Sequence, residues 1–181
     1  MSRYHSYLNN AVKIIKGYQA GSPLALHLKD FFSKEKKIGS RDRKAISALC
    51  YQYYRCALLL EKRINSIDQV IIHSVWLCSM ESSDFLKVMA PEWNQRVHFS
   101  LIEKCRLLEI DPTVFFQFDY LVSDALDKER FAYSLYSQPF VFLRIRPGKY
   151  DTVVTALKKN EIDYTVIDFD SIALKSNISI D

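Results

Sequence analysis

The sequence predicts a mainly α-helical fold, a helical bundle followed by a small α/β segment, and three observations support this. Apolar residues recur at intervals of three and four over most of 1–138, as on one face of an amphipathic helix. The 181 residues include only 4 Gly and 5 Pro, too few for the many tight turns of a β-sandwich or barrel. After residue 138 the pattern changes to short runs rich in β-branched and aromatic residues. We therefore expect a helical domain over 1–138 and a small α/β segment over 139–181.

Three helices are predicted in the first part of the helical domain. The first runs over Tyr4–Tyr18, where apolar side chains repeat every three to four residues before two glycines end the pattern. Ser22 is expected to cap a second helix over Pro23–Lys34, with the proline in its first turn. Ser40 is expected to cap the third, whose apolar positions continue to Leu60 and form the longest helical pattern in the chain.

The rest of the helical domain is predicted to contain shorter helices around one buried helix. Ile67–Met80 is almost wholly apolar, so it belongs in the middle of a bundle. Two further helices are expected over Phe85–Met89 and Arg96–Leu108, separated by a break that contains a proline. Pro112 is then expected to open a single turn, and Lys128–Tyr136 to close the bundle.

The last part of the chain has the order β-α-β-β. Strands are predicted at Phe140–Ile145, Tyr164–Phe169 and Ile172–Leu174, and a helix at Tyr150–Lys159. Three short strands and one helix are few for a sheet that has to be stable on its own. We therefore expect this segment to pack on the bundle or to be the beginning of a longer α/β domain.

The positive charge of the chain is concentrated near the N-terminus. The whole sequence has 25 Lys and Arg against 21 Asp and Glu, a net charge of +4. Residues 1–63 contain 13 of the basic residues and 4 of the acidic ones, which gives this part +9 and leaves −5 for residues 64–181. Such a basic region is typical of a surface that contacts phosphate, although excess lysine also serves solubility.

Common catalytic and cofactor patterns are missing from the sequence. It contains no GxGxxG or P-loop motif for a nucleotide, and no HExxH or CxxC motif for a metal. The histidines have no neighbour in sequence that would activate a nucleophile. We therefore predict no catalytic residue, no metal site and no cofactor site within these residues.

The cysteines and the hydropathy pattern indicate the kind of protein. Cys50, Cys56, Cys78 and Cys105 are scattered without the spacing of a disulfide framework, so we expect reduced, mostly buried thiols in a cytoplasmic protein. No apolar stretch approaches the roughly 18 residues that a membrane span needs. The N-terminus lacks the basic-then-apolar order of a signal peptide, and no membrane partner is expected.

A basic face is predicted on the third helix. The candidate RNA-binding residues are spaced so that they fall near one stripe of the helix, opposite its apolar face. They are Arg41, Lys44, Tyr51, Arg55 and Lys62. Lysine and arginine displace counterions from a phosphate backbone, and a tyrosine ring stacks on a base. The alternative is a solvated face with no partner, and the residue pattern supports the two interpretations about equally. Arg43 is offset from this face, so we expect it to form an internal salt bridge with Asp30 or Asp42.

A second basic group is predicted at the end of the first strand. It consists of Arg144, Arg146 and Lys149, and the two arginines share one face of the strand because side chains repeat every second residue. Two neighbouring cations need an anionic partner. That partner is either RNA or one of three nearby carboxylates, and the carboxylates are slightly favoured: Asp151, Asp168 and Asp170.

Four segments of the chain resemble a known family of RNA-modifying enzymes. Gly21–Leu24 (GSPL), Gly39–Arg43 (GSRDR) and Tyr51–Arg55 (YQYYR) resemble the NusB-like helical domain in front of Sun (Fmu)-type RNA cytosine-5 methyltransferases. Phe142–Lys149 (FLRIRPGK) and the helix and strands after it resemble the small α/β segment that links that domain to the catalytic domain. These segments occur in the same order as in the family and extend over nearly the whole chain. The middle, Ile64–Gln138, resembles the family only in its helical character.

The resemblance implies a function for the chain. Enzymes of this family methylate cytosine in ribosomal RNA with S-adenosylmethionine, using cysteines in Thr-Cys and Pro-Cys motifs. Neither motif is present here, nor is the glycine-rich cofactor loop. The resemblance therefore implies a non-catalytic, RNA-binding N-terminal region whose catalytic domain follows Asp181, with ribosomal RNA as partner and S-adenosylmethionine bound elsewhere in the full-length enzyme. The alternative is a NusB-like module that binds a protein partner.

Overall fold

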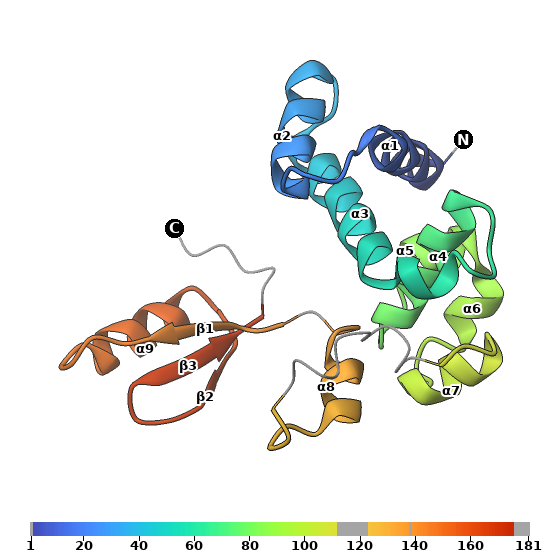
Figure 1. Cartoon of the computed structure of the whole chain (residues 1–181). Helices are drawn as coiled ribbons and strands as arrows, with labels where there is room; N and C mark the ends of the chain where they lie inside the picture. The colour runs from blue at the N-terminus through green and yellow to red at the C-terminus, as the bar shows by residue number, and fades with distance from the viewer. Residues whose placement is uncertain (1, 112–122, 138, 176–181) are drawn as a thin grey trace. The chain divides into compact units, whose positions relative to one another are not determined.

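The computed structural model describes residues 2–111, 123–137 and 139–175, and the chain folds as two compact units (Figure 1). The first unit is Met1–Ser137 and the second is Gln138–Asp181. The described part of the first unit is helical, and the second contains a small three-stranded antiparallel sheet with one helix. A mainly helical chain with a short α/β segment is therefore confirmed.

Most helices of the first unit follow the predicted pattern, but the expected break after Met89 is only Ala90, and Pro91 begins a short helix that was not predicted. Their bounds are α1 Arg3–Gly17, α2 Leu24–Lys34, α3 Ser40–Leu60, α4 Ile67–Cys78, α5 Asp84–Met89, α6 Pro91–Gln95, α7 Leu101–Leu107 and α8 Lys128–Ser134. The three N-terminal helices and the apolar α4 are where the periodicity places them. The turn expected at Pro112 lies outside the described residues.

Two predicted helix caps are wrong by one residue. Pro23, not Ser22, is the N-cap of α2, because its carbonyl accepts the first helical hydrogen bond, from the amide of Leu26 at 3.0 Å. Gly39 is the N-cap of α3 for the same reason, and Ser40 is already helical. Neither helix has a side-chain cap. A cap contributes only about 1 kcal/mol, so burial of the apolar face decides where each helix begins.

The single helix expected over Arg96–Leu108 is also wrong. Residues 96–99 form turns, and α7 begins only after Ser100. Ser100 and Glu103 form a capping box, in which the Ser100 Oγ accepts from the Glu103 amide and the Glu103 carboxylate accepts from the Ser100 amide at 2.8 Å. This reciprocal pair satisfies two amides that a helix start would leave unpaired.

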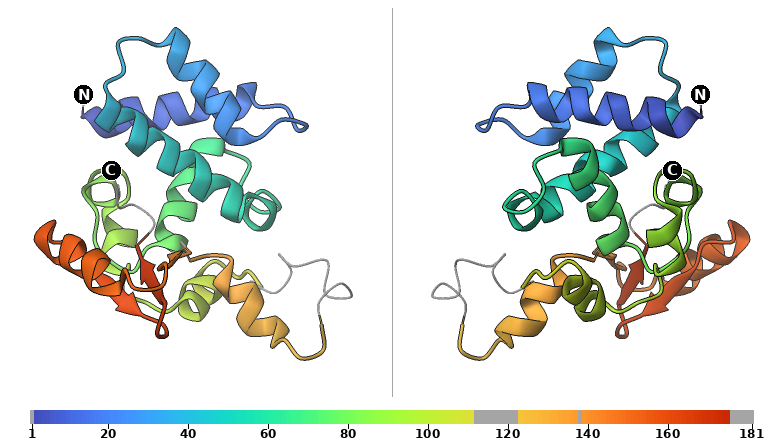
Figure 2. Two further views of the ribbon diagram at one scale, coloured as in Figure 1. Left: turned by 90° about the vertical axis from the view of Figure 1, so that its left-hand side faces the viewer. Right: turned by 90° about the vertical axis from the view of Figure 1, so that its right-hand side faces the viewer.

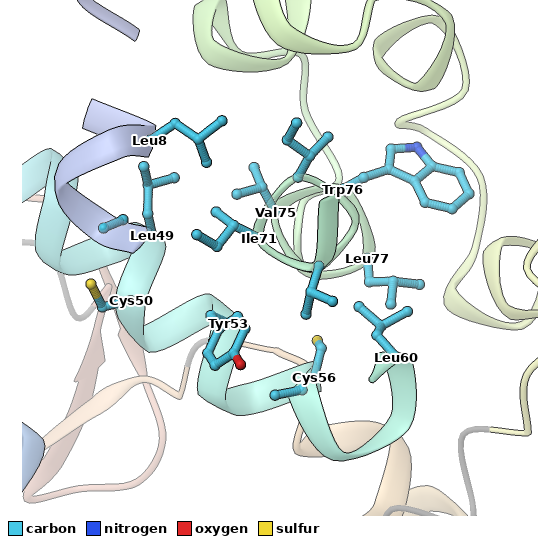
Figure 3. Close-up of a cluster of buried hydrophobic side chains, with 14 of the residues drawn as sticks. Leu8, Leu49, Cys50, Tyr53, Cys56, Leu60, Ile71, Val75, Trp76 and Leu77 are labelled. Atoms are coloured by element: carbon cyan, nitrogen blue, oxygen red, sulfur yellow. The ribbon is translucent and has the colours of Figure 1, made fainter. Parts of the chain in front are cut away.

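The core of the first unit surrounds α4. Figure 3 looks along this helix, whose side chains extend in several directions into the cluster, including Ile71, Val75 and Trp76. The longest helix, α3, packs beside it and contributes buried residues such as Leu49 and Leu60. Most of α4 is buried, as its composition predicted, and its exposed polar residues, Asp68 and Gln69, lie in its first turn.

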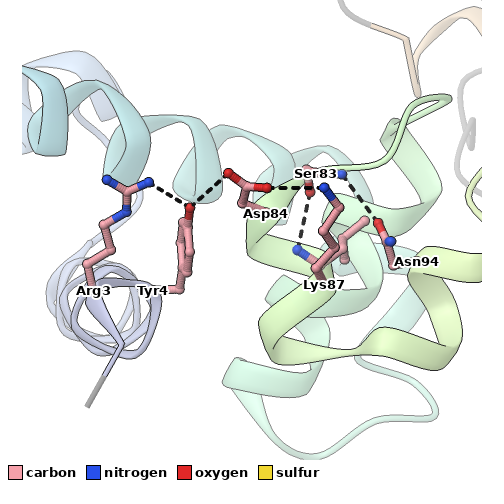
Figure 4. A network of polar contacts seen from close by, with 7 residues as sticks. Arg3, Tyr4, Ser83, Asp84, Lys87 and Asn94 are labelled. Atoms are coloured by element: carbon pink, nitrogen blue, oxygen red, sulfur yellow. Dashed lines mark hydrogen bonds and ion pairs between the residues drawn. The ribbon is translucent and has the colours of Figure 1, made fainter.

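Polar contacts connect α1 to α5 and α6 at the edge of this core (Figure 4). Arg3 donates to the Tyr4 hydroxyl at 2.8 Å, and that hydroxyl donates to the Asp84 carboxylate. Asp84 forms an ion pair with Lys87 at 3.2 Å. The pairs are exposed, so they orient α1 and contribute little to stability.

The second unit has the predicted order β-α-β-β. Its elements are β1 Val141–Arg144, α9 Tyr150–Lys159, β2 Tyr164–Val166 and β3 Ser171–Leu174. The strand order is β1-β3-β2, with both pairs antiparallel. β2 ends at Val166, earlier than expected, because the Ile167 amide turns back to the Ser171 carbonyl at 3.0 Å and closes the hairpin.

One face of the small sheet is covered by α9, which lies along it in both views of Figure 2. Leu157 of α9 packs with Ile145, Ile172 and Leu174 in a core separate from that of the first unit. Side chains alternate along a strand, so the residues between these positions point to the opposite face of the sheet. That opposite face displays part of the candidate site.

Candidate nucleic-acid interface

The predicted basic face is present on α3. Arg41, Lys44 and Tyr51 are exposed, and Arg55 is half-buried. Lys62 is exposed too, but it lies in the turn that follows the helix, so it is the one predicted residue of this group that α3 does not present. The arrangement follows from the opposite side of α3, where eight residues from Ile46 to Leu60 are buried.

Arg55 points partly towards the core. Cys56 of α3 and Cys78 of α4 place their Sγ atoms 3.6 Å apart. The hydrogen bond from Cys56, together with the positive charges of Arg55 and Lys104, lowers the pKa of the Cys78 thiol. Arg41 and Lys44 are therefore the outer cations of the face. The four cysteines are free thiols, and all but Cys78 are buried.

The acidic residues at the two ends of α3 are bound to tyrosines. Tyr7 of α1 donates its hydroxyl to Asp42, and Tyr53 donates to Glu61. The bond to Asp42 raises the pKa of Tyr7, while burial and then the bond to Glu61 raise that of Tyr53. Within the described residues, Arg41 forms no ion pair with an acidic side chain. The charge of Arg41 is thus available to an anion.

The salt bridge predicted for Arg43 is wrong. Its guanidinium Nε donates to the carbonyl of Ile38 at 2.8 Å, and the group lies over the ring of Phe32, 5.7 Å from its centre. Asp30 pairs instead with Lys34 at 2.7 Å. The carbonyl and the ring satisfy this half-buried cation, so it needs no carboxylate. Arg43 is internal, as its offset position predicted.

The second basic group is held at one end of β1. Arg144 donates its Nε to Asp170 at 2.9 Å, so the carboxylate alternative is confirmed for this arginine. Its side chain is nevertheless 84% exposed, and the bond leaves its other N–H donors for a phosphate. Hydrogen bonds from Ser171 and then Arg144 lower the pKa of Asp170. Arg146 and Lys149 are exposed and form no ion pair among the residues described.

Two exposed aromatic residues accompany these arginines, and the sequence prediction omitted them: one lies on the outward face of β1 and the other just before the strand. Phe142 is 65% exposed and Phe140 is 53% exposed. Leu143 and Ile145, between the outward positions, pack towards α9. The signal was present in the run FVFLRIR, because the alternation that pairs Arg144 with Arg146 also places both phenylalanines on that face.

A hollow of about 220 Å³ adjoins α3 on its other side. Its lining comes from α1, α3, α4, α5 and nearby loop residues, and it is mainly apolar, with Tyr4, Tyr7 and Phe85 among the side chains. Both tyrosine hydroxyls are already bound, to Asp84 and Asp42 respectively. The hollow therefore presents ring surface and few free polar groups.

Lys104 is another charged residue that the sequence prediction omitted. It is completely buried and donates to the carbonyls of Trp76 and Ser79, at the C-terminal end of α4. Burial lowers its pKa to about 8. The lysine satisfies carbonyls that the end of a helix leaves unpaired, so its role is structural.

Within the described part of the chain, no group of three or more His, Cys, Asp or Glu side chains is arranged to hold a metal ion. None of the described helices has both the length and the hydropathy that a bilayer span requires. No protein family, curated protein or solved structure shows significant similarity to this chain. The assignment of a function therefore depends on the two basic surfaces.

Proposed function

We propose that this chain is a non-catalytic RNA-binding region that docks structured RNA for a methyltransferase domain of the Sun (Fmu) type. The observation that carries the proposal is the outward face of α3, where Arg41, Lys44 and Tyr51 are exposed together. The carboxylates at the two ends of α3, Asp42 and Glu61, accept hydrogen bonds from tyrosines. Arg41 forms no ion pair among the described residues, so its guanidinium supports the proposal that this face contacts an anionic ligand.

The chemistry of these residues suits an RNA backbone. Cations that contact phosphates release the counterions condensed on the nucleic acid, which makes binding favourable and dependent on salt. The planar guanidinium of Arg41 matches two phosphate oxygens at once, and Lys44 adds a point charge one turn along the helix. The ring of Tyr51, 45% exposed, is placed to contact a sugar or an unpaired base. The ribosomal RNA that the sequence resemblance implies is the ligand we propose.

S-adenosylmethionine, the cofactor of such enzymes, does not fit the residues present. Its phosphate-free nucleoside is usually held by a glycine-rich loop, and the four glycines of this chain are isolated from one another. Of the four glycines, Gly21 and Gly148 have positive φ angles, and the space around each is open. We assign the cofactor and the methyl transfer to a separate catalytic domain.

The proposal is tested by reversing the charge of the α3 face. Arg41→Glu with Lys44→Glu is expected to weaken binding of a ribosomal-RNA hairpin and to reduce the slope of log affinity against log salt by about 2. Glutamate in the first turn of α3 interacts favourably with the helix dipole, so the fold tolerates the change at Arg41. Binding is measured by fluorescence anisotropy at several salt concentrations.

The matched control is Lys158→Glu with Lys159→Glu, which makes the same change in net charge on α9. It is expected to leave the slope unchanged. If the α3 variant binds as the unmodified chain does, or if the α9 variant loses as much affinity, the α3 face is not the docking surface. Binding that shows no dependence on salt also contradicts the proposal.

A further inference from the structure

The outward face of β1 combines two features that seldom occur together on a small sheet. Phe142 and Arg144 lie on the outward face of β1, and the exposed Phe140 and Arg146, just before and after the strand, continue the same alternating row in the sequence. Large exposed aromatic residues in a contiguous patch mark a binding surface, and the neighbouring cations exclude a purely apolar ligand. We infer that this row, which we call the Phe–Arg row, binds an unpaired segment of RNA, with bases stacked on the two rings and phosphates on the arginines.

The sheet leaves the ring of Phe142 accessible. In the register of the strands, Phe142 lies opposite Ala173 on β3, which in turn lies opposite Thr165 on β2. Both neighbours are small and Ala173 is buried, whereas Phe142 is 65% exposed, so its ring is an accessible apolar group on this face. An exposed ring of this kind is suited to stacking on the face of a base.

The spacing along β1 favours unpaired nucleotides over a duplex. Residues on the same face of a strand lie about 6.7 Å apart, roughly twice the 3.4 Å between stacked base pairs. Two bases on Phe140 and Phe142 must therefore be unstacked from each other. In duplex RNA the faces of the bases are covered by their neighbours, and the deep major groove is closed to side chains.

The cations are placed to complete such a site. Arg144 keeps an exposed guanidinium although it is bound to Asp170, and Arg146 lies two residues further along the same row. Lys149 follows the turn at Gly148, whose φ of +72° is readily adopted by glycine. The positive charge is thus concentrated at one end of the aromatic pair. This arrangement suits a single-stranded RNA whose bases stack on the rings and whose phosphates continue towards the arginines.

This inference rests on the proposed function, since RNA is the ligand in both, but it concerns a different surface and a different class of RNA. The α3 face contacts the backbone of structured RNA, whereas the Phe–Arg row selects unpaired bases. Variants in the two surfaces therefore separate the two statements.

The test uses the complete chain and an RNA of about 12 nucleotides, a length within the range that small single-strand sites cover. The RNA carries a fluorescent adenine analogue whose emission changes when it stacks, and it is measured single-stranded and annealed to its complement. Phe142→Ala is expected to weaken single-strand binding roughly 5- to 150-fold, the effect of losing one stacked base, and to abolish the fluorescence change. Duplex binding is expected to be unchanged.

Two further variants make the test specific. Phe169→Ala removes another exposed aromatic ring, 88% exposed in the β2–β3 turn, and is expected to bind as the unmodified chain does. Phe142→Leu keeps an apolar side chain without the ring, and it is expected to lose affinity almost as far as Phe142→Ala. Thermal unfolding of each variant checks that the fold is retained, as expected for exposed positions.

Several results would overturn the inference. Unchanged single-strand binding by Phe142→Ala, alongside loss of binding in Arg41→Glu with Lys44→Glu, would refute the Phe–Arg row and leave the proposed function intact. Equal loss in Phe169→Ala, or full binding by Phe142→Leu, would show that ring stacking at this site is not the cause. If the chain self-associates and Phe142→Ala abolishes that association, the Phe–Arg row is an interface between two copies of the chain and not an RNA site. Absence of any RNA binding would refute both statements.

Discussion

Lys104 shows what a single charged residue does inside the first unit. It is completely buried, and its ammonium group donates to two carbonyls at the C-terminal end of α4. The hydrogen bonds stabilise the end of this helix, while burial disfavours the charged form and lowers the pKa to about 8. The ordinary pKa of lysine is about 10.4, so Lys104 releases its proton at a lower pH in the folded chain than in the unfolded chain.

This difference predicts a pH dependence of stability. Between pH 8 and about 10.4 the unfolded chain keeps a proton that the folded chain has released, so the contribution of Lys104 to stability rises with pH. The free energy of unfolding of the wild type, minus that of Lys104→Met, is expected to rise by roughly 1–3 kcal/mol across this window. Urea unfolding in the presence of a reductant measures it at each pH.

The control for that measurement is Lys128→Met, which removes one positive charge at an exposed position. A difference between wild type and Lys104→Met that stays constant from pH 8 to 10.4 would show that the buried ammonium is not destabilised by its surroundings.

The sequence predicted some residues of the site and missed others for physical reasons. Arg41, Lys44 and Arg144 were found because helical and strand periodicity place side chains on known faces. The bond between Tyr7 and Asp42 joins residues 35 positions apart, and no local pattern contains it. The partner of Arg43 was missed because a carbonyl and an aromatic ring replace the carboxylate that charge alone suggests.

At the scale of elements, α4 is the helix on which the first unit is built. Its residues pack against α1, α3, α5 and α7, and seven of its twelve residues are buried. α3 has one buried side and one exposed side, so it can present charge to solvent only because α4 completes the core behind it. The position of the candidate interface therefore depends on the packing between these two helices.

Truncation of an α4 side chain tests this dependence. Ile71→Ala, at a completely buried position, is expected to reduce the free energy of unfolding by about 2–5 kcal/mol, because it removes apolar burial and leaves a cavity. Val88→Ala, at a position of α5 that is 44% exposed, is expected to change it by less than about 0.5 kcal/mol. If urea unfolding shows that the two variants lose equal free energy of unfolding, the packing of α4 does not dominate the stability of the first unit.

The elements themselves were largely predictable, whereas their ends were not. Long periodic patterns identified α1, α3 and α4, since apolar spacing reflects burial directly. The ends depend on small differences between local hydrogen bonds, which is why Ser22 and Ser40 were expected as caps and Arg96 as helical. The Ser100–Glu103 capping box is readable in the sequence, but the prediction followed the apolar pattern, which runs through it.

At the scale of the whole molecule, the chain consists of two units with separate cores. Each unit displays one basic surface: the α3 face on the first and the Phe–Arg row on the second. The net charge of +4 conceals both surfaces, because residues 1–63 carry +9, whereas the Phe–Arg row lies in a part of the chain that carries −5. In the function that we propose, the α3 face contacts the backbone of structured RNA and the Phe–Arg row contacts an unpaired segment.

The measurement that tests the central claim most directly is an NMR titration of the isotope-labelled chain with a ribosomal-RNA hairpin at low salt. We expect the largest shifts of backbone amide signals in the first unit on the outward face of α3, at Arg41, Lys44, Tyr51 and Arg55, and we expect added salt to reverse them. Shifts that are absent, or that are confined in that unit to α5 and α6, would contradict the claim.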